Sequence, residues 1–250
     1  MTTRAAELLG RFLDGLLDDG PALRLGDGAA DGPAVLAASG AVEGRDVVVC
    51  ACAGELGAAD VELCCRAVEL AARTGHPLLT VHDGAAPRPA DGLAVRGATG
   101  RLLRACARLS GVVPQVAVVL GEVTAEQAVL VALADVVVVA DAVADGAVPG
   151  TRPRADLPAP GTAAAADLVR DVLSFLPANN LAAPPRLPPQ PPATGPAGDL
   201  AGLVPAHPTA GYDVREVVAE LADDGEVLEL GAGLPGGVVT GFARLDGRSA

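Results

Sequence analysis

Two stretches that each follow a predicted strand carry polar residues able to act on a bound ligand: residues 82–92 and 121–127. In α/β proteins, ligands bind at the carboxyl ends of parallel strands, where the first N–H groups of the next helix are free. Glu122 and Glu126 in the second stretch stand four residues apart, a spacing that puts both on one helix face. Such a pair either serves general acid–base chemistry or is a solvated first turn that favours the helix dipole, and both interpretations stay open.

Histidine and cysteine offer a second kind of chemistry. His82 lies beside Asp83 and could activate Cys106 or Ser110 as a nucleophile. Cys106 falls on the apolar stripe of a predicted helix, however, which favours an inert core thiol. The five cysteines are odd in number and lack zinc-binding spacing, so we expect reduced, buried thiols and no metal site. They are Cys50, Cys52, Cys64, Cys65 and Cys106.

A glycine pattern near the end of the chain resembles a nucleotide-binding motif. Residues 231–236 spell GxGxxG, which binds dinucleotides only when a helix follows and offers its N-terminus to the pyrophosphate. Here Pro235 and the strand-like sequence VVTGFARL follow instead. The pattern therefore indicates a turn between strands.

The composition excludes several classes of function. The net charge is −13, all cations are arginine and aromatic residues make up 2%, so we expect no nucleic-acid partner. Without lysine, phosphate-loop and Schiff-base chemistry are also excluded. The first residues lack an apolar signal core, and Asp135 interrupts the longest apolar stretch, so we expect a cytoplasmic protein that does not span a membrane.

Strands and helices alternate through the first part of the chain. Apolar runs predict strands at 46–52, 78–81, 115–120 and 136–140, the second ending in a turn at Asp83-Gly84. Apolar stripes predict helices at 55–75, 97–110 and 124–133. This alternation is typical of a parallel sheet covered by helices and joined by right-handed crossovers.

An internal repeat connects the two ends of the chain. Residues 18–28 and 223–233 share the pattern Asp-Asp-Gly-x-x-Leu-x-Leu-Gly-x-Gly, and each copy follows a predicted helix and precedes a strand ending in Gly-Arg. A repeat of this kind indicates a duplicated domain. We expect a first domain at 1–176, a proline-rich linker at 177–208 and the start of a second domain at 209–250, with 226–250 poorly ordered in the absence of a partner.

Several long segments resemble a known family. ELAARTGHPLL, RLSGVVPQVAVVLG, LVRDVLSFLPANNLAAPPR and LVPAHPTAGYDVREVVAELADDGEVLEL are similar to the β subunits of biotin-dependent acyl-CoA carboxylases, such as propionyl-CoA carboxylase. The resemblance covers nearly the whole chain. It implies an α/β, crotonase-like fold built as a β-β-α superhelix, with one complete domain and the start of a second.

The resemblance also implies the site residues. The family's Asp-Ser-Gly-Gly-Ala-Arg, whose backbone N–H groups stabilise the enolate of the thioester, stands here as Asp-Gly-Ala-Ala-Pro-Arg, and its Ala-Gly-Gly-Ala as Thr-Ala-Glu-Gln. Alanine restricts the backbone and Pro87 removes a donor, so the motifs are degenerate. The stretch between Ala140 and Asp167 is expected to be shorter than the family's substrate-covering segment. The implied substrate-binding residues are Asp83, Gly84, Ala85, Ala86, Arg88, Gly121 and Ala125.

Three functions follow from these features. The first is a divergent, truncated carboxyltransferase-family protein that lacks normal activity alone and pairs with a full-length β subunit or with itself. The second is a repurposed enzyme acting on an acyl thioester, with Glu126 as general acid or base and the amides of Ala85 and Ala86 as a partial oxyanion hole. The third is a coenzyme A binding module. The expected ligand is acyl-CoA, with no tightly bound cofactor, and biotin would be carried by a partner.

Overall fold

The computed structural model describes residues 2–20, 23–25, 34–140, 155–191, 200–207, 209–232 and 237–250. It divides into two compact units, one made of residues 1–171 and 177–182 and the other of residues 172–176 and 183–250. The expected boundaries at 176 and 208 stay predictions. No helix among the described residues is both long and apolar enough to cross a membrane.

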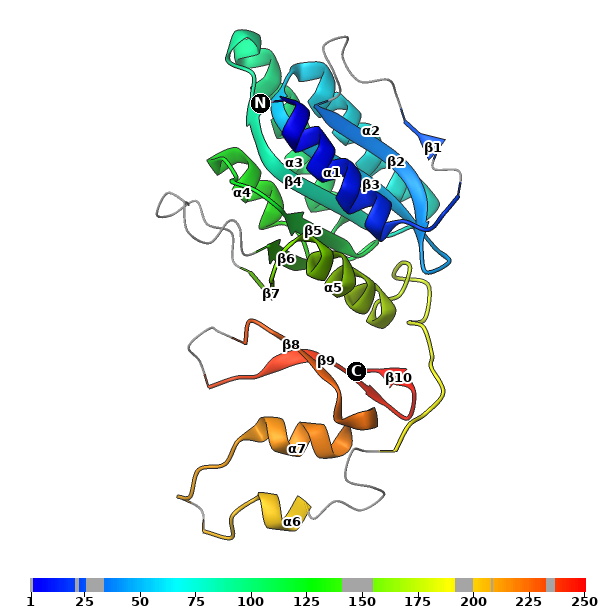
Figure 1. Cartoon of the computed structure of the whole chain (residues 1–250), viewed down its shortest axis with the longest axis vertical. Helices are drawn as coiled ribbons and strands as arrows, with labels where there is room; N and C mark the ends of the chain where they lie inside the picture. Colours follow the sequence, from blue (N-terminus) through cyan, green and yellow to red (C-terminus); the bar gives the residue numbers. More distant parts are fainter. Residues whose placement is uncertain are drawn as a thin grey trace. The chain divides into compact units, whose positions relative to one another are not determined.

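The first unit is built on a seven-stranded sheet whose strand order follows the chain (Figure 1). Strands β3 to β7 are parallel to one another, whereas β1, β2 and β3 pair antiparallel. The sheet is therefore mixed, and the prediction of a parallel sheet holds for five of its strands. The strands are β1 (Leu23–Arg24), β2 (Val35–Val42), β3 (Arg45–Leu56), β4 (Leu78–Pro87), β5 (Gln115–Val119), β6 (Val136–Ala140) and β7 (Leu157–Ala159).

Helices cover both faces of this sheet. In Figure 1, α1 and α5 lie in front of it and α2 and α3 behind it. Both faces are apolar because every residue of β3 from Val47 to Ala53 is buried, as parallel strands between two helical layers require. The helices of the first unit are α1 (Thr2–Leu16), α2 (Ala58–Thr74), η1 (Pro89–Asp91), α3 (Gly92–Leu109), α4 (Ala125–Val131) and α5 (Thr162–Phe175), of which α5 ends in the second unit.

Strand β4 runs past the point where the sequence predicts its end. The predicted turn at Asp83-Gly84 is wrong, because β4 continues to Pro87 and pairs there with Leu56 of β3. The pairing register shifts between Ala53 and Glu55, and Gly84 takes a φ of +64°, a conformation that glycine adopts without strain. The irregularity lets a Gly-Ala-Ala-Pro sequence stay in the sheet. Helix α3 likewise begins at Gly92, five residues before its predicted start.

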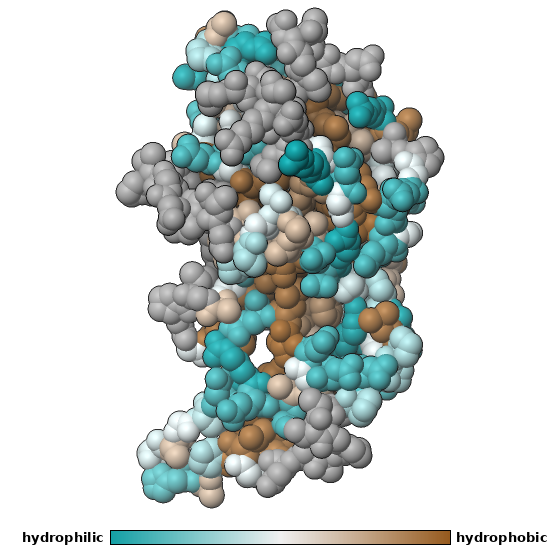
Figure 2. Space-filling model, in the orientation of Figure 1, coloured by the Kyte–Doolittle hydropathy of each residue, from teal (hydrophilic) through white to brown (hydrophobic). Residues whose placement is uncertain are grey.

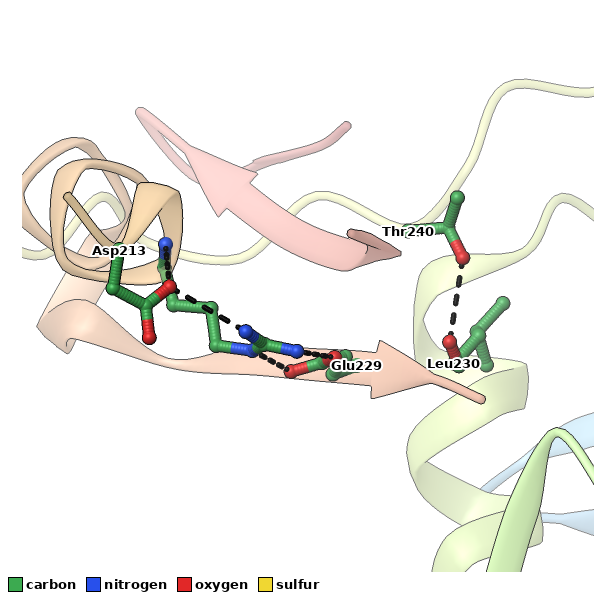
Figure 3. Close-up of polar contacts among 5 residues, drawn as sticks. Asp213, Glu229, Leu230 and Thr240 are labelled. Atoms are coloured by element: carbon green, nitrogen blue, oxygen red, sulfur yellow. Dashed lines mark hydrogen bonds and ion pairs between the residues drawn. The ribbon is translucent and has the colours of Figure 1, made fainter. Parts of the chain in front are cut away.

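The second unit contains a three-stranded antiparallel sheet, in which β9 (Thr240–Leu245) lies between β8 (Val227–Leu230) and β10 (Arg248–Ser249). It also contains α6 (Leu200–Leu203), α7 (Val214–Leu221) and η3 (Asp223–Gly225). Arg215 of α7 donates two hydrogen bonds, both of 2.7 Å, to the carboxylate of Glu229 on β8, and Asp213 caps the helix (Figure 3). The described part of 226–250 forms paired strands, and the expectation that it is poorly ordered without a partner stays a prediction.

The sequence repeat has a counterpart in the structure. Asp18 accepts hydrogen bonds from the backbone N–H groups of Glu43 and Gly44, at 2.9 and 2.7 Å. Asp223 accepts two from Asp246 and Gly247, at 3.0 and 2.7 Å. In each case the first aspartate of the repeat holds the tight turn of a β-hairpin, so the preceding strand ends before the Gly-Arg pair. The repeat's glycines at 26, 28 and 233 lie outside the described residues.

Candidate functional site

The two stretches identified after predicted strands meet in the structure. The N–H of Gly84 donates to the carbonyl oxygen of Glu122 at 3.1 Å, and the N–H of Leu120 donates to the carbonyl oxygen of His82 at 2.9 Å. Gly121 lies so close to Asp83 that a side chain at 121 would overlap the carboxylate. The ends of β4 and β5 therefore form one joint, consisting of residues 82–84 and 120–122.

Asp83 is the partly buried acidic residue of this joint, which also contains the exposed Glu122. The Asp83 side chain is partly buried, and the loss of solvent raises the pKa of its carboxyl above the ordinary value. Gly84, next along the strand, is exposed. The joint thus combines an accessible backbone with a carboxylate that takes up a proton more readily than a solvated one.

His82, which belongs to the joint, forms a buried polar pair with Gln127. The Nδ1 atom of His82 is 2.7 Å from Oε1 of Gln127, which belongs to α4, and both side chains are buried. Burial lowers the pKa of His82, so its imidazole is neutral at physiological pH. The Nε2 atom of His82 has no hydrogen-bond partner. The sequence analysis did not predict this pair. The available signal was the position of Gln127, which directly follows Glu126 on a short predicted helix.

The predicted acidic pair Glu122 and Glu126 does not share a helix face. Helix α4 begins at Ala125, with Thr124 as its N-cap, so Glu122 lies outside the helix. Ala125 and Glu126 are both exposed, and Gln127 is the residue of this turn that points inward. The structure thus brings Gly121 to the joint and leaves Glu126 at the surface.

The residues after Gly84 lie in the sheet. Ala85 is buried, and Ala86 is in register with Glu55 of β3. Arg88 follows the strand, and its guanidinium lies 3.9 Å from the buried carboxylate of Asp60 at the start of α2. Its side chain stays 38% exposed, which leaves part of the guanidinium available to a ligand.

The five cysteines are buried and form no disulfides, which confirms the expectation of buried free thiols. Burial raises the pKa of Cys106 to about 11, so this thiol is a poor nucleophile. Cys50, Cys52 and Cys64 form a cluster whose sulfur atoms all lie within 4.8 Å of one another. Hydrogen bonding with the thiols of Cys50 and Cys64 lowers the pKa of Cys52. Spacing rules missed this cluster because a strand and a helix supply its members.

Gly231 and Ala232, the described start of the glycine pattern, form a turn after β8. Gly231 has a φ of +67°, and the next described element is the strand β9. Gly233 and Gly236 lie outside the described residues, as does most of the stretch between Ala140 and Asp167. Because a strand follows rather than a helix, the pattern lacks the helix N-terminus that a dinucleotide requires.

Comparisons with known proteins agree on one family. The carboxyl transferase domain matches residues 25–152 and 154–250. The biotin-dependent acetyl-/propionyl-coenzyme A carboxylase beta5 subunit of Mycobacterium tuberculosis is 32% identical over 244 aligned positions, which cover 82% of this chain and 44% of that subunit. The chain thus spans about half the length of the curated relatives it matches.

Solved structures show the same likeness in three dimensions. The transcarboxylase 12S hexamer with hydrolysed methylmalonyl-coenzyme A bound superposes with a TM-score of 0.86 and 26% identity, over 98% of this chain and 57% of that one. The β subunit of geranyl-CoA carboxylase from P. aeruginosa gives a TM-score of 0.61 and 28% identity, over 99% of this chain and 56% of that one. The fold is therefore α/β and crotonase-like, and the chain belongs to the carboxyl transferase family, together with the β subunits of biotin-dependent acyl-CoA carboxylases.

Proposed function

We propose that this chain binds an acyl-CoA at the joint between β4 and β5 and acts with a full-length carboxyltransferase β subunit. The observation that supports this most directly is the hydrogen bond from Gly84 to Glu122, which joins two segments that resemble the family's acyl-CoA motifs. Relatives of this chain carry acetyl-, propionyl- or methylmalonyl-CoA in their names. Biotin is carried by a partner in this proposal, and no residue of this chain is assigned to it.

In the proposal, the thioester lies over the exposed backbone of Gly84. A thioester carbonyl gains negative charge when its α-carbon loses a proton, and backbone N–H groups stabilise that charge. The amides of Ala85 and Ala86 are the nearest candidates, but Ala85 is buried and Ala86 lies beside β3. This placement supports a binding function over full carboxyl transfer by this chain alone.

Arg88 is proposed to contact the phosphates of coenzyme A. It directly follows β4, four residues along the chain from Gly84, and its guanidinium is partly exposed in a chain whose net charge is −13. An arginine presents several donors to a phosphate and keeps its charge at any physiological pH. Arg88→Gln is therefore expected to weaken the binding of acyl-CoA and of free coenzyme A alike, whereas Arg104→Gln on an exposed position of α3 leaves both unchanged.

Calorimetric titration of the purified chain with acetyl-, propionyl- and malonyl-CoA, with free coenzyme A as control, tests the proposal. We expect saturable binding whose affinity depends on the acyl group, because the thioester end lies in the joint. Equal affinity for all four compounds would favour the alternative function, a coenzyme A binding module. No binding of any of them would refute the site.

Pairing with a β subunit requires its own experiment. We expect the tagged chain to copurify with a full-length β subunit expressed in the same cells, in a fixed ratio, and self-association is the other form of pairing considered. A chain that elutes as a monomer from cells containing both proteins would contradict this part of the proposal.

Glu126 tests the repurposed-enzyme alternative. Its carboxylate is exposed in the first turn of α4 and therefore accessible to a ligand. If Glu126 is the general acid or base of an acyl-thioester reaction, Glu126→Gln abolishes turnover and leaves binding intact. Turnover that is unchanged in this variant would exclude that function for Glu126.

A further inference from the structure

Three buried thiols come together on one face of the large sheet. Cys50 and Cys52 are two residues apart on β3 and so point to the same face, and Cys64 of α2 packs over them. All three side chains are at most 5% exposed. The Sγ atoms of Cys52 and Cys64 are 3.7 Å apart, and all three sulfurs lie within 4.8 Å of one another.

The sulfur spacing suits a single metal ion. Thiolates bind zinc at about 2.3 Å, and two sulfurs at neighbouring corners of a tetrahedron with that bond length lie about 3.8 Å apart. The Cys52–Cys64 pair is already at 3.7 Å, so an ion requires little movement of the backbone there. Because β3 and α2 are held by the surrounding core, the three donors are largely preorganised.

His82 supplies an independent observation that points to the same ligand. It is in register with Cys52 on the neighbouring strand, is 3% exposed and lines the same cavity as the three cysteines. Its Nδ1 is held by Oε1 of Gln127, so the hydrogen lies on Nδ1 and the Nε2 lone pair is free. A buried imidazole with one nitrogen fixed and the other without a partner is the usual arrangement of a metal-binding histidine.

The size of the cavity limits what can bind. Its volume is about 30 Å³, whereas a single water needs roughly 10–15 Å³ by this kind of measure. One ion therefore fits. The lining of thiols and one imidazole is a soft donor set, which selects zinc(II) or copper(I) over magnesium or calcium.

We propose that Cys50, Cys52 and Cys64 bind one thiophilic metal ion with a filled d shell, zinc(II) or copper(I). His82 lines the same cavity but lies outside the cluster of sulfurs, so its Nε2 joins as a fourth donor only when the ring moves toward the ion. Each thiol that binds loses its proton to solvent and no redox change takes place. The ion would fasten α2 to β3. The three thiols are separate from the residues proposed to contact acyl-CoA, and the metal site stands whether or not that function holds.

The test uses the full chain, purified with reductant and stripped of metal. Zinc(II) is titrated in competition with a colorimetric chelator, and copper(I) in competition with a copper(I)-specific one. We expect one equivalent of one of these ions to bind, and cobalt(II) at the same site to show the strong absorption of a thiolate-bound ion. Binding of neither zinc(II) nor copper(I) would overturn the proposal.

Two variants locate the ion. Cys64→Ser is expected to lower the affinity at least about 10-fold, since it removes a ligand. Cys106→Ser is the matched control: Cys106 is buried and lines the same cavity but lies outside the cluster, so its loss leaves the affinity unchanged. Equal affinity in the two variants would refute the assignment.

A measurement on the unaltered chain guards against a variant that does not fold. Bound metal is expected to slow alkylation of Cys50, Cys52 and Cys64, followed by mass spectrometry, and to leave the rate at Cys65 unchanged. The proposed site would be contradicted if metal protected all five cysteines equally or protected none of them. A Cys52–Cys64 disulfide that persists in reductant would also overturn it, because two of the ligands would be consumed.

Discussion

At the scale of single residues, Gly121 packs closely against Asp83 and Gly84. A side chain there would overlap the carboxylate of Asp83 and approach the backbone of Gly84. Gly121→Ala is therefore expected to push the ends of β4 and β5 apart, lower the free energy of unfolding by about 1–3 kcal/mol and weaken acyl-CoA binding. Urea denaturation measures the first effect and calorimetric titration the second.

Gly100→Ala is the matched control for that variant. Gly100 is exposed on α3, and an added methyl group would contact nothing. Alanine is the better helix former, so this substitution should raise the free energy of unfolding by up to about 1 kcal/mol and leave binding unchanged. If both variants behave alike, the close approach of Gly121 to Asp83 is not what matters at this position.

At the scale of elements, the repeated aspartates each hold a hairpin together. Asp18 accepts two backbone N–H groups of the turn between β2 and β3, so Asp18→Ala should lower the melting temperature of the protein by several degrees. Asp19→Ala removes a neighbouring exposed carboxylate and should leave the melting temperature unchanged. Thermal unfolding followed by circular dichroism compares the two. An equal effect of both variants would show that charge alone, and not the turn, matters.

The equivalent aspartate of the second unit makes stability depend on pH. Hydrogen bonds from the backbone of Gly247, and then of Asp246, lower the pKa of Asp223 in the folded state. The stability it contributes is therefore fully present above the unfolded-state pKa of about 3.9 and is lost as the pH falls through the lower folded-state value. Asp223→Asn should flatten that part of the curve, measured by melting temperature between pH 2 and about 5. An unchanged curve would contradict the assignment.

At the scale of the whole molecule, the second unit has side-chain contacts of its own. Phe242 on β9 stacks on Phe175 with ring centroids 5.7 Å apart, and the Arg244 guanidinium lies 4.5 Å from the centre of the Phe175 ring. Figure 2 shows hydrophilic and hydrophobic side chains side by side on the described surface. The isolated chain should therefore keep this unit folded without a partner.

Hydrogen exchange tests that expectation. Backbone amides of β8 and β9 should exchange more slowly than those at residues 237–239, which lie in no strand. The protection arises because the strands pair with each other and Arg215 holds α7 against β8. Equally fast exchange in both segments would mean that a partner is needed to order the unit.

The sequence by itself determined the alternation of strands and helices, the family, the repeat and the burial of the thiols. These are local properties, because the apolar periodicity, the sequence motifs and the composition are all features of short segments. The same locality explains its errors. Gly84 to Pro87 has the composition of a turn, and only the neighbouring β3 keeps it in the sheet.

Which residues meet follows from contacts between distant segments of the chain. His82 and Gln127 are 45 positions apart, and Cys64 reaches Cys52 from a different element, so no spacing within one segment predicts either contact. Glu126 shows the converse, because its helix turns it to the surface while the neighbouring Gln127 points inward. A side chain's direction depends on where its helix begins and how that helix packs on the sheet, and both are set by contacts between distant parts of the chain.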